Sequence, residues 1–317
     1  MSFMSRFVRG CFPLVVLTLL LLLAACTPKQ PVLDLPDAEN LHFTPDGRLI
    51  ASGKGIYEIV LRNGQYEALP LYAGDCAFAG IAQRGNWLYS VCATGPLWAS
   101  KRYLLAAEVQ PGITPQFQII KQIDLVIPNG MAFDRNGVLL LADENFLGGG
   151  KVMRVHIADG ATPQVTRIDD WLDYRHGVFY PNGIRVVGDQ LFLTDTGNVK
   201  IIRFDDNGTI LANRTLYSRN TIFDDLLPAC GGAAVADYIN GTVLYIDRDG
   251  NKRYESSAQS FPGASSLQIG RPPLFTGYQL LVTEKGMLLE TDSRIGDKLS
   301  TIRADFDLAE YVAGCAP

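Results

Sequence analysis

A pattern of short apolar strands recurs six times along the chain, and this repetition restricts the possible folds more than any other feature. Each copy has an apolar pair, a turn containing Gly or Asp, an apolar strand and then a second hairpin. The turns are of the Asp-Gly, Asn-Gly and Gly-Asp types that hairpins require. The copies begin about 40–53 residues apart and cover residues 40–69, 78–112, 128–160, 181–213, 223–255 and 265–300.

Four strands per unit at this period indicate a β-propeller. A sheet of this size cannot bury both faces alone, so the units pack face to face around an axis, and six of them close into a ring with few exposed edges. We therefore predict an all-β fold, a six-bladed β-propeller of four-stranded antiparallel blades over residues 37–317. The alternative is a β-sandwich with a helical appendage, which rarely shows such tandem regularity.

The N-terminal segment has the pattern of an export signal. Arg6 and Arg9 precede an apolar run over residues 12–25. This run is shorter than the roughly 20 residues of a membrane span and suits a signal-peptide core. It ends in Leu23-Ala24-Ala25-Cys26, which resembles a bacterial lipobox and implies cleavage before Cys26 and lipidation of that residue. A signal that stays uncleaved, or is cleaved without lipidation, is the alternative.

These features predict the topology of the mature protein. Residues 1–25 are the signal peptide, and residues 26–36 are the lipidated cysteine with a Pro-rich tether. Thr27 stands where an Asp would retain such a lipoprotein in the inner membrane. We expect a cell-envelope protein, anchored by lipid to the outer membrane and facing the periplasm, which contacts the membrane through this anchor only.

Composition excludes other classes of function. Hydrophobic residues make up 47% of the chain and charged residues 19%, enough for a core. After removal of residues 1–25, 26 basic and 33 acidic side chains remain, a net charge of −7. A nucleic-acid-binding protein should have a basic field, so we expect no nucleic-acid partner. The chain has three histidines, and a three-histidine zinc site would need all of them. We expect a monomer.

Four cysteines remain after Cys11 and Cys26 are set aside, and an even number in an exported protein suggests disulfides with three possible pairings. Cys76 and Cys92 flank one predicted hairpin that turns at residues 84–86, so they can face each other. Cys230 would then pair with Cys315. A cysteine nucleophile is the alternative, but no histidine lies in a recognisable cysteine-enzyme motif.

Polar residues open four of the repeats. They are Glu39, Asn129, Asn182 and Asp224, and each immediately precedes a predicted innermost strand. Innermost strands line the channel of a propeller, so these positions converge on its axis. Asn-Gly pairs are also ordinary turn chemistry, but two Pro-Asn-Gly copies followed by Asp224-Asp225 favour a site.

Two carboxylates close together in a partly dry channel repel each other unless a cation is present. Calcium prefers carboxylate and amide oxygens, and the set has no nitrogen or sulfur ligand for zinc or copper. The sequence therefore predicts a Ca²⁺ site, with another divalent cation as the alternative.

Residues 128–144 (PNGMAFDRNGVLLLADE) and 181–197 (PNGIRVVGDQLFLTDTG) are similar to the senescence-marker-protein/gluconolactonase/paraoxonase-like group of six-bladed propellers. The likeness covers about residues 37–312. In that group a Glu, two Asn and an Asp hold a catalytic calcium, in the order of Glu39, Asn129, Asn182 and Asp224. The resemblance implies hydrolysis of lactones, other esters or phosphotriesters, with Asp224 or Asp225 activating water or attacking directly.

The chain departs from this group in one respect. Paraoxonase-like lactonases place a histidine near the channel from the second blade, whereas residues 76–81 here contain none. His176, six residues before Asn182, can reach the pocket from a loop or have no role, and His42 and His156 lie in strand patterns. We therefore hold two hypotheses: a calcium-dependent hydrolase of lactone or other ester substrates, and a non-enzymatic propeller that binds a ligand or protein.

Overall fold

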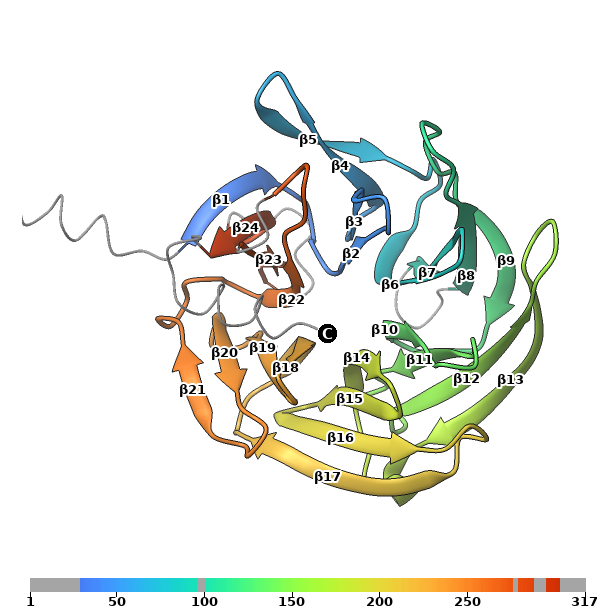
Figure 1. Ribbon diagram of the computed structural model, residues 1–317, viewed down its shortest axis with the longest axis vertical. Helices are drawn as coiled ribbons and strands as arrows, with labels where there is room; N and C mark the ends of the chain where they lie inside the picture. Colours follow the sequence, from blue (N-terminus) through green and yellow to red (C-terminus); the bar gives the residue numbers. More distant parts are fainter. Residues whose placement is uncertain (1–28, 96–100, 276–278, 288–294, 303–317) are drawn as a thin grey trace, which may run out of the picture.

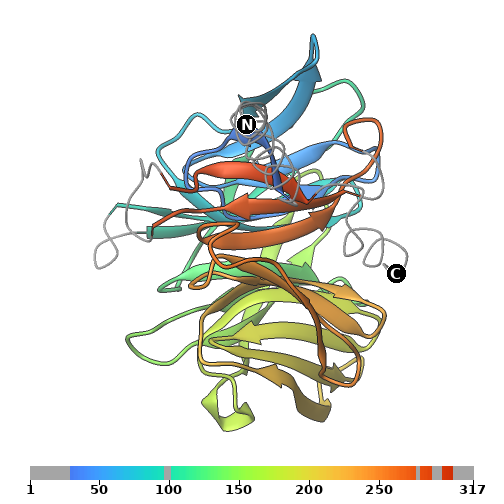
Figure 2. The same cartoon turned by 90° about the vertical axis from the view of Figure 1, so that its left-hand side faces the viewer.

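The computed structural model describes residues 29–95, 101–275, 279–287 and 295–302, and over these ranges it forms six four-stranded antiparallel sheets in a ring (Figure 1). This confirms the predicted six-bladed β-propeller. Figure 1 shows the blades following one another around the ring in chain order, and Figure 2 shows the same sheets from the side. Within the described ranges the one helical element is the 3-10 turn η1 (Tyr174–His176), and no helix there is long and apolar enough to span a membrane.

Five blades each consist of four consecutive strands, numbered from the axis outward. The first contains β2 (Leu41–Phe43), β3 (Leu49–Ser52), β4 (Ile56–Arg62) and β5 (Gln65–Pro70). The second contains β6 (Ala77–Arg84), β7 (Trp87–Thr94), β8 (Lys101–Glu108) and β9 (Gln118–Ile123). The third contains β10 (Pro128–Phe133), β11 (Leu139–Asp143), β12 (Lys151–Ala158) and β13 (Gln164–Leu172). The fourth contains β14 (Pro181–Val187), β15 (Gln190–Asp195), β16 (Asn198–Phe204) and β17 (Ile210–Ser218). The fifth contains β18 (Phe223–Ala229), β19 (Gly232–Asp237), β20 (Thr242–Ile246) and β21 (Lys252–Glu255).

The sixth blade joins the two ends of the described chain. Its inner strands are β22 (Ala264–Ile269), β23 (Leu280–Glu284) and β24 (Lys298–Ile302), and its outermost strand is β1 (Lys29–Asp34). β1 pairs antiparallel with β24 along its length, and Lys29 Nζ lies 2.6 Å from Glu284 Oε2. Residues 29–34 fall within the interval 26–36 that the sequence assigned to a tether. They form a strand here because Val32 and Leu33 pack against the core.

The apolar core lies between neighbouring blades. Leu140 and Val152 of the third blade, for example, pack in one fully buried cluster with Ile184 and Leu193 of the fourth. A fully buried Leu, Ile or Val side chain contributes about 1.5–3 kcal/mol relative to an exposed one. The faces that a single blade would leave in water are therefore covered by the next blade around the ring.

Three of the innermost strands carry a bulge at their second and third residues. In β10, Pro128 pairs with Asp143 and the next pair is Met131 with Leu141. Residues 129–130 therefore lie opposite one residue of β11. β14 has the same shift at residues 182–183 and β18 at residues 224–225. A bulge of this kind changes the direction in which a side chain points. Both Pro-Asn-Gly copies therefore lie in the first residues of strands, where they form bulges and not turns.

The glycines of these bulges allow the inner strands to approach closely. A Cβ atom on Gly130 would lie 2.4 Å from the carbonyl oxygen of Asn182, and one on Gly183 would lie 2.5 Å from the Cα atom of Asp225. Both separations are shorter than any real contact of a Cβ atom. Glycine is therefore required at these two positions, whereas Asp225 occupies the equivalent place in the bulge of β18.

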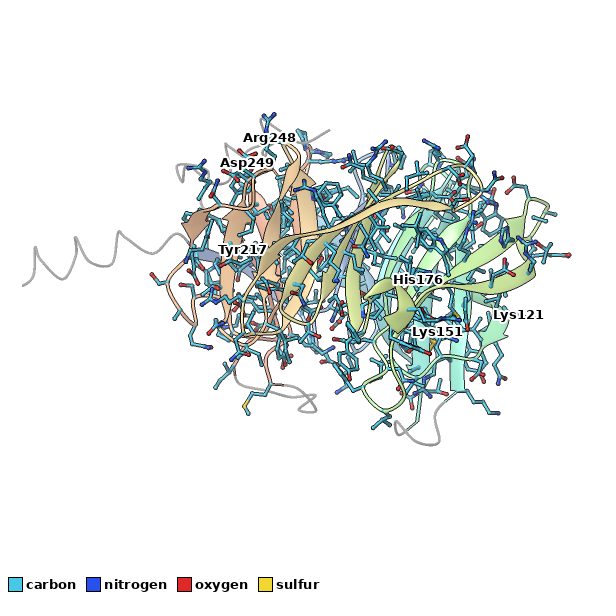
Figure 3. The ribbon with its side chains drawn as sticks, turned by 90° about the horizontal axis from the view of Figure 1, so that it is seen from below. Lys121, Lys151, His176, Tyr217, Arg248 and Asp249 are labelled. Carbon is cyan, nitrogen blue, oxygen red and sulfur yellow. A yellow bond between two sulfur atoms is a disulfide. The ribbon has the colours of Figure 1, made fainter. Side chains whose placement is uncertain are left out.

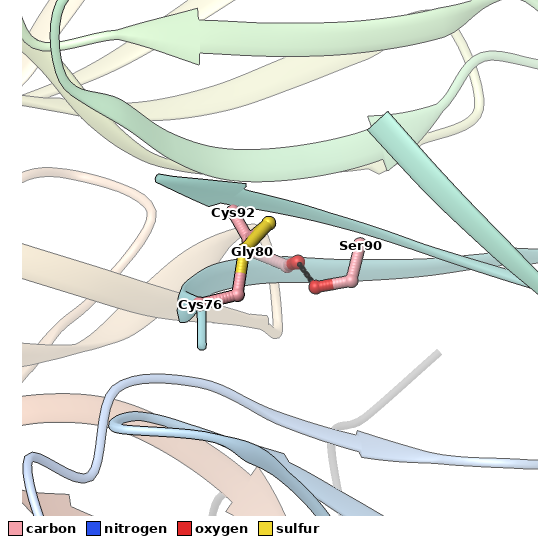
Figure 4. The surroundings of a disulfide bond; sticks show 4 residues. All are labelled: Cys76, Gly80, Ser90 and Cys92. Carbon is pink, nitrogen blue, oxygen red and sulfur yellow. Dashed lines mark hydrogen bonds between the residues drawn. A yellow bond between two sulfur atoms is a disulfide. The ribbon is translucent and has the colours of Figure 1, made fainter. Parts of the chain in front are cut away.

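The predicted disulfide between Cys76 and Cys92 is confirmed, with the two Cα atoms 5.7 Å apart (Figure 4). It links the start of β6 to β7 across the hairpin that turns at Arg84 and Trp87. Ser90 Oγ donates a 2.8 Å hydrogen bond to the carbonyl of Gly80 beside it. Cys230 takes part in a disulfide. Its expected partner, Cys315, lies outside the described residues, as does Cys26, and that pairing stays a prediction.

Candidate metal centre

Hydroxyl side chains on the second strand of one blade hold the backbone of the next blade at the axis. Thr194 on β15 donates to the carbonyl oxygen of Asp224, and Thr283 on β23 donates to that of Glu39 at 3.2 Å. Ser52 on β3 does the same for Ala79 at 2.5 Å. The backbone of two predicted ligands is therefore fixed by the preceding blade.

Aspartates that end the second strands hold the segments leading to the bulges. Asp143 Oδ1 accepts hydrogen bonds from the backbone N–H groups of Val126 and Ile127, at 3.1 and 2.8 Å. Asp195 Oδ1 accepts from the N–H of Tyr180 at 2.8 Å. These bonds fix the chain just before Pro128 and Pro181, so these aspartates position the inner strands and are not part of the centre.

The four predicted ligands are all buried at the inner ends of their blades. Their relative exposures are 6% for Glu39, 7% for Asn129, 4% for Asn182 and 6% for Asp224. Asn129, Asn182 and Asp224 stand in the bulges of β10, β14 and β18, whose labels lie nearest the middle of the ring in Figure 1. Side chains distant in the sequence are thereby brought to one end of the inner strands.

Glu144 joins two of these residues and was missed by the sequence analysis. Its Oε2 atom accepts hydrogen bonds from Asn129 Nδ2 at 3.2 Å and from Asn182 Nδ2 at 3.0 Å. It directly follows Asp143, at a position occupied by Thr196 in the fourth blade and Tyr238 in the fifth. An acid that directly follows the aspartate at the end of a second strand is the sequence signal that could have identified Glu144. A glutamate exposed to solvent would give the same sequence pattern.

The carboxylates of the centre are close enough to influence one another. Burial, with a smaller contribution from Glu39, raises the pKa of Glu144 to about 8. Burial and the charges of Glu39 and Glu144 raise the pKa of Asp224 well above its ordinary value. Burial also raises the pKa of Glu39, although Lys285 opposes it. Without a further cation, the protein therefore disfavours full ionisation of this group.

Asp225 is held by its neighbours on three other blades. Its Oδ2 atom accepts hydrogen bonds from Arg185, from Ser266 Oγ at 2.6 Å and from Asn40 Nδ2 at 3.4 Å. Its Oδ1 atom accepts from the N–H of Leu226 at 2.8 Å. Asp224, in contrast, accepts no side-chain hydrogen bond from the residues described. The two adjacent aspartates therefore differ, and Asp225 is already satisfied as the partner of Arg185.

Lys285 is a second residue that the sequence analysis did not single out. Its ammonium group pairs with Glu39 Oε2 and lies 3.7 Å from Asp37 Oδ1. Burial lowers the pKa of Lys285, but the charges of Glu39 and Asp37 outweigh that effect and raise it. It directly follows Glu284 at the end of β23, the place that Glu144 has after Asp143 in the third blade, but the residue type at this place differs from blade to blade.

The histidines lie apart from this centre. His176 Nδ1 lies 3.0 Å from Asp173 Oδ1 on the segment between β13 and β14 (Figure 3). His42 on β2 pairs with Gln83 Oε1 at 3.0 Å, and burial lowers its pKa to about 4. His156 on β12 pairs with Asp169 at 3.0 Å. Among the described residues, none of the three is hydrogen-bonded to or ion-paired with a predicted ligand.

The donor set fits a hard cation only if the carboxamides take part. Within the described ranges, no three His, Cys, Asp or Glu side chains group closely enough to hold a metal by themselves. Asn129 and Asn182 both point their Nδ2 atoms at Glu144, which turns their Oδ1 atoms away from it. Asn182 Oδ1 is buried and has no hydrogen-bond partner. A buried acceptor without a donor is costly, and a cation bound by oxygen atoms would satisfy it.

The comparison with solved structures supports the fold. No protein-family model matches the chain, and no curated protein sequence matches it. The calcium-binding protein regucalcin from Agrobacterium tumefaciens matches with a TM-score of 0.61 and 16% identity, over 85% of this chain and 90% of that one.

Two further solved structures are similar. A gluconolactonase from Xanthomonas campestris matches with a TM-score of 0.56 and 15% identity, over 86% of this chain and 88% of the other. The PQQ-bound aldose sugar dehydrogenase from Streptomyces coelicolor matches with a TM-score of 0.57 and 15% identity, over 86% and 95%. At these identities the likeness shows a shared propeller fold.

Proposed function

We propose that this protein is a divalent-cation-dependent hydrolase of lactone or other ester substrates, with Ca²⁺ as its cation. The observation that carries the proposal is the buried oxygen cluster at the inner ends of the blades. The gluconolactonase and regucalcin among the similar structures support it. Glu39, Asn129, Asn182 and Asp224 would hold the ion.

The formal charges of the centre suit one divalent cation. Four buried carboxylates, on Glu39, Glu144, Asp224 and Asp225, face two cationic side chains, Lys285 and Arg185. Asp37 also lies 3.7 Å from Lys285, but its side chain is partly exposed to water. Among the four buried carboxylates, Arg185 pairs with Asp225 and Lys285 pairs with Glu39, which leaves two negative charges. A divalent ion would balance them and offset the cost of keeping both carboxylates ionised in a buried site.

The residues of the chain have separable roles in this scheme. When bound, the ion would polarise the carbonyl oxygen of the substrate and stabilise the negative charge that develops there. Asp224 would take the proton of the attacking water, because its carboxylate is not already bonded within the part of the chain described here. Asp225 keeps the inner strands in place through Arg185 and Ser266, so of the two aspartates Asp224 is assigned as the base.

The test is a pair of matched variants. Asp224→Asn should abolish both Ca²⁺ binding, measured by calorimetry, and turnover of a panel of lactones and aryl esters. Asp249→Asn, which alters an exposed aspartate at the surface (Figure 3), should change neither. Unchanged turnover in Asp224→Asn would refute the proposed mechanism.

The second candidate is a propeller that binds a ligand without turnover. The pairing of Glu39 with Lys285 favours it, because one predicted ligand already has a cationic partner. The same panel separates the two: stabilisation by Ca²⁺ that follows mass action, without turnover of any substrate, indicates binding alone.

We also propose that the protein is a lipoprotein anchored at Cys26. β1 pairs with β24 of the sixth blade, and its first residue, Lys29, lies three residues after Cys26. A three-residue link spans at most about 10 Å, so the anchor would hold the protein beside this blade. Replacing Cys26 by Ser should release the protein from the membrane fraction.

A further inference from the structure

Backbone hydrogen bonds of Lys285 and of the residue after it fix the position of Lys285. Its N–H donates to the carbonyl oxygen of Gly263 at 2.8 Å, and the hydroxyl of Tyr238 donates to the carbonyl oxygen of Gly286 at 2.8 Å. The side chain of Lys285 is 20% exposed and that of Glu39 is 7% exposed. The ammonium group is therefore directed at Glu39 from a fixed point on the neighbouring blade.

The position of this ammonium group matters because it already supplies a positive charge to a predicted ligand. Glu39 Oε2 accepts from Lys285 Nζ, and Asp37 lies 3.7 Å from the same nitrogen. A divalent ion bound by Glu39 would lie near this ammonium group, and like charges at such short range repel strongly where water is scarce. In the absence of an ion, the same group spares Glu39 the cost of an unpaired buried charge.

We propose that Lys285 is a built-in counter-cation that competes with the divalent ion for Glu39 and so lowers the affinity of the centre. This inference rests on the proposed metal centre. It assigns to Lys285 two opposite effects: the lysine stabilises the protein without metal and weakens the binding of metal. A lysine that merely positions Glu39 would instead strengthen metal binding.

The experiment measures Ca²⁺ binding to the folded protein by calorimetry and the unfolding temperature with and without EGTA. Lys285→Met removes the charge with little change in length, and Lys285→Arg keeps the charge. Lys121→Met, which changes an exposed lysine on β9 (Figure 3), is the matched control. We expect Lys285→Met to bind Ca²⁺ at least about tenfold more tightly than the wild type. Without metal it should unfold at a lower temperature and gain more from added Ca²⁺. The arginine variant and the control should resemble the wild type.

The outcomes separate this inference from the function on which it rests. If the wild type binds Ca²⁺ and Lys285→Met binds it equally or more weakly, competition by Lys285 is wrong and the metal centre stands. If neither the wild type nor any variant binds a divalent ion, both the metal centre and the competition are wrong. Should Lys285→Met fail to fold without metal, refolding in the presence of Ca²⁺ is the deciding measurement, and failure there overturns the inference.

Discussion

The buried carboxylate of Glu144 should make the stability of the metal-free protein depend on pH. Its pKa is raised by burial from the ordinary 4.5 to about 8 in the folded protein. Between these values the folded protein holds a proton that the unfolded chain releases. The free energy of unfolding therefore decreases as pH rises across this interval, by about 1.4 kcal/mol per pH unit for one proton.

The magnitude follows from the same two values. Below pH 4.5 both forms are protonated, and above about pH 8 both are ionised, so the loss is complete there. The upper limit for this one group is about 5 kcal/mol at about 1.4 kcal/mol per pKa unit. The pKa values of Glu39 and Asp224 are raised in the same direction and add to the slope.

The assay is urea unfolding in EGTA at pH 5–9, comparing the wild type with Glu144→Gln. Glutamine keeps an oxygen that can accept from Asn129 and Asn182 but cannot titrate. We expect the free energy of unfolding of the variant to fall less steeply with pH, by an amount that corresponds to about one proton. Glu67→Gln, at a glutamate whose side chain is 46% exposed, should leave the slope unchanged. Equal slopes for the wild type and Glu144→Gln would show that Glu144 is ionised normally and that this reasoning is wrong.

Three further predictions concern the architecture around the centre. Replacing Cys76 and Cys92 by Ala opens a link across 16 residues and should lower the free energy of unfolding by about 3 kcal/mol; an unchanged urea midpoint would contradict this. Arg185→Met leaves Asp225 buried without a cation and should lower the free energy of unfolding by about 3–5 kcal/mol. Adding Asp225→Leu to this variant should recover part of the loss, and a double variant as unstable as the single one would contradict the prediction. Gly130→Ala should lower the free energy of unfolding by about 1–3 kcal/mol, because the added Cβ would clash with a backbone oxygen. In the same assay Gly160→Ala, whose Cβ would lie 3.5 Å from the nearest atom, should have almost no effect.

The sequence was sufficient to predict the fold because each blade repeats the same local information. Apolar strands, tight turns and a fixed period recur, so errors at single boundaries do not alter the ring. The inner-strand positions of Asn129, Asn182 and Asp224 could be predicted for the same reason, since they occupy equivalent places in successive repeats. The pair Cys76 and Cys92 followed from one local hairpin.

The residues that were missed have no repeated side-chain type. Glu144 and Lys285 stand at equivalent places, after the acid that ends the second strand of the third and sixth blades, but one is an acid and the other a base. Only the packed ring shows that one contacts two asparagines and the other contacts Glu39. Strand β1 was missed because its pairing partner, β24, lies at the far end of the sequence and no local pattern indicates it. Pro-Asn-Gly resembles a turn motif, but here its Asn and Gly form a bulge, and the Gly allows neighbouring inner strands to pack closely.

The pairing of β1 with β24 also governs when the molecule can finish folding. Lys29 meets Ile302, about 270 residues later, so the first strand to be synthesised waits for almost the last. Contacts of such long range are slow to form because the chain loses much freedom when its ends meet. During that delay β1 and β24 each present an unsatisfied hydrogen-bonding edge, the kind of surface that chaperones shield or that joins a second molecule by strand exchange.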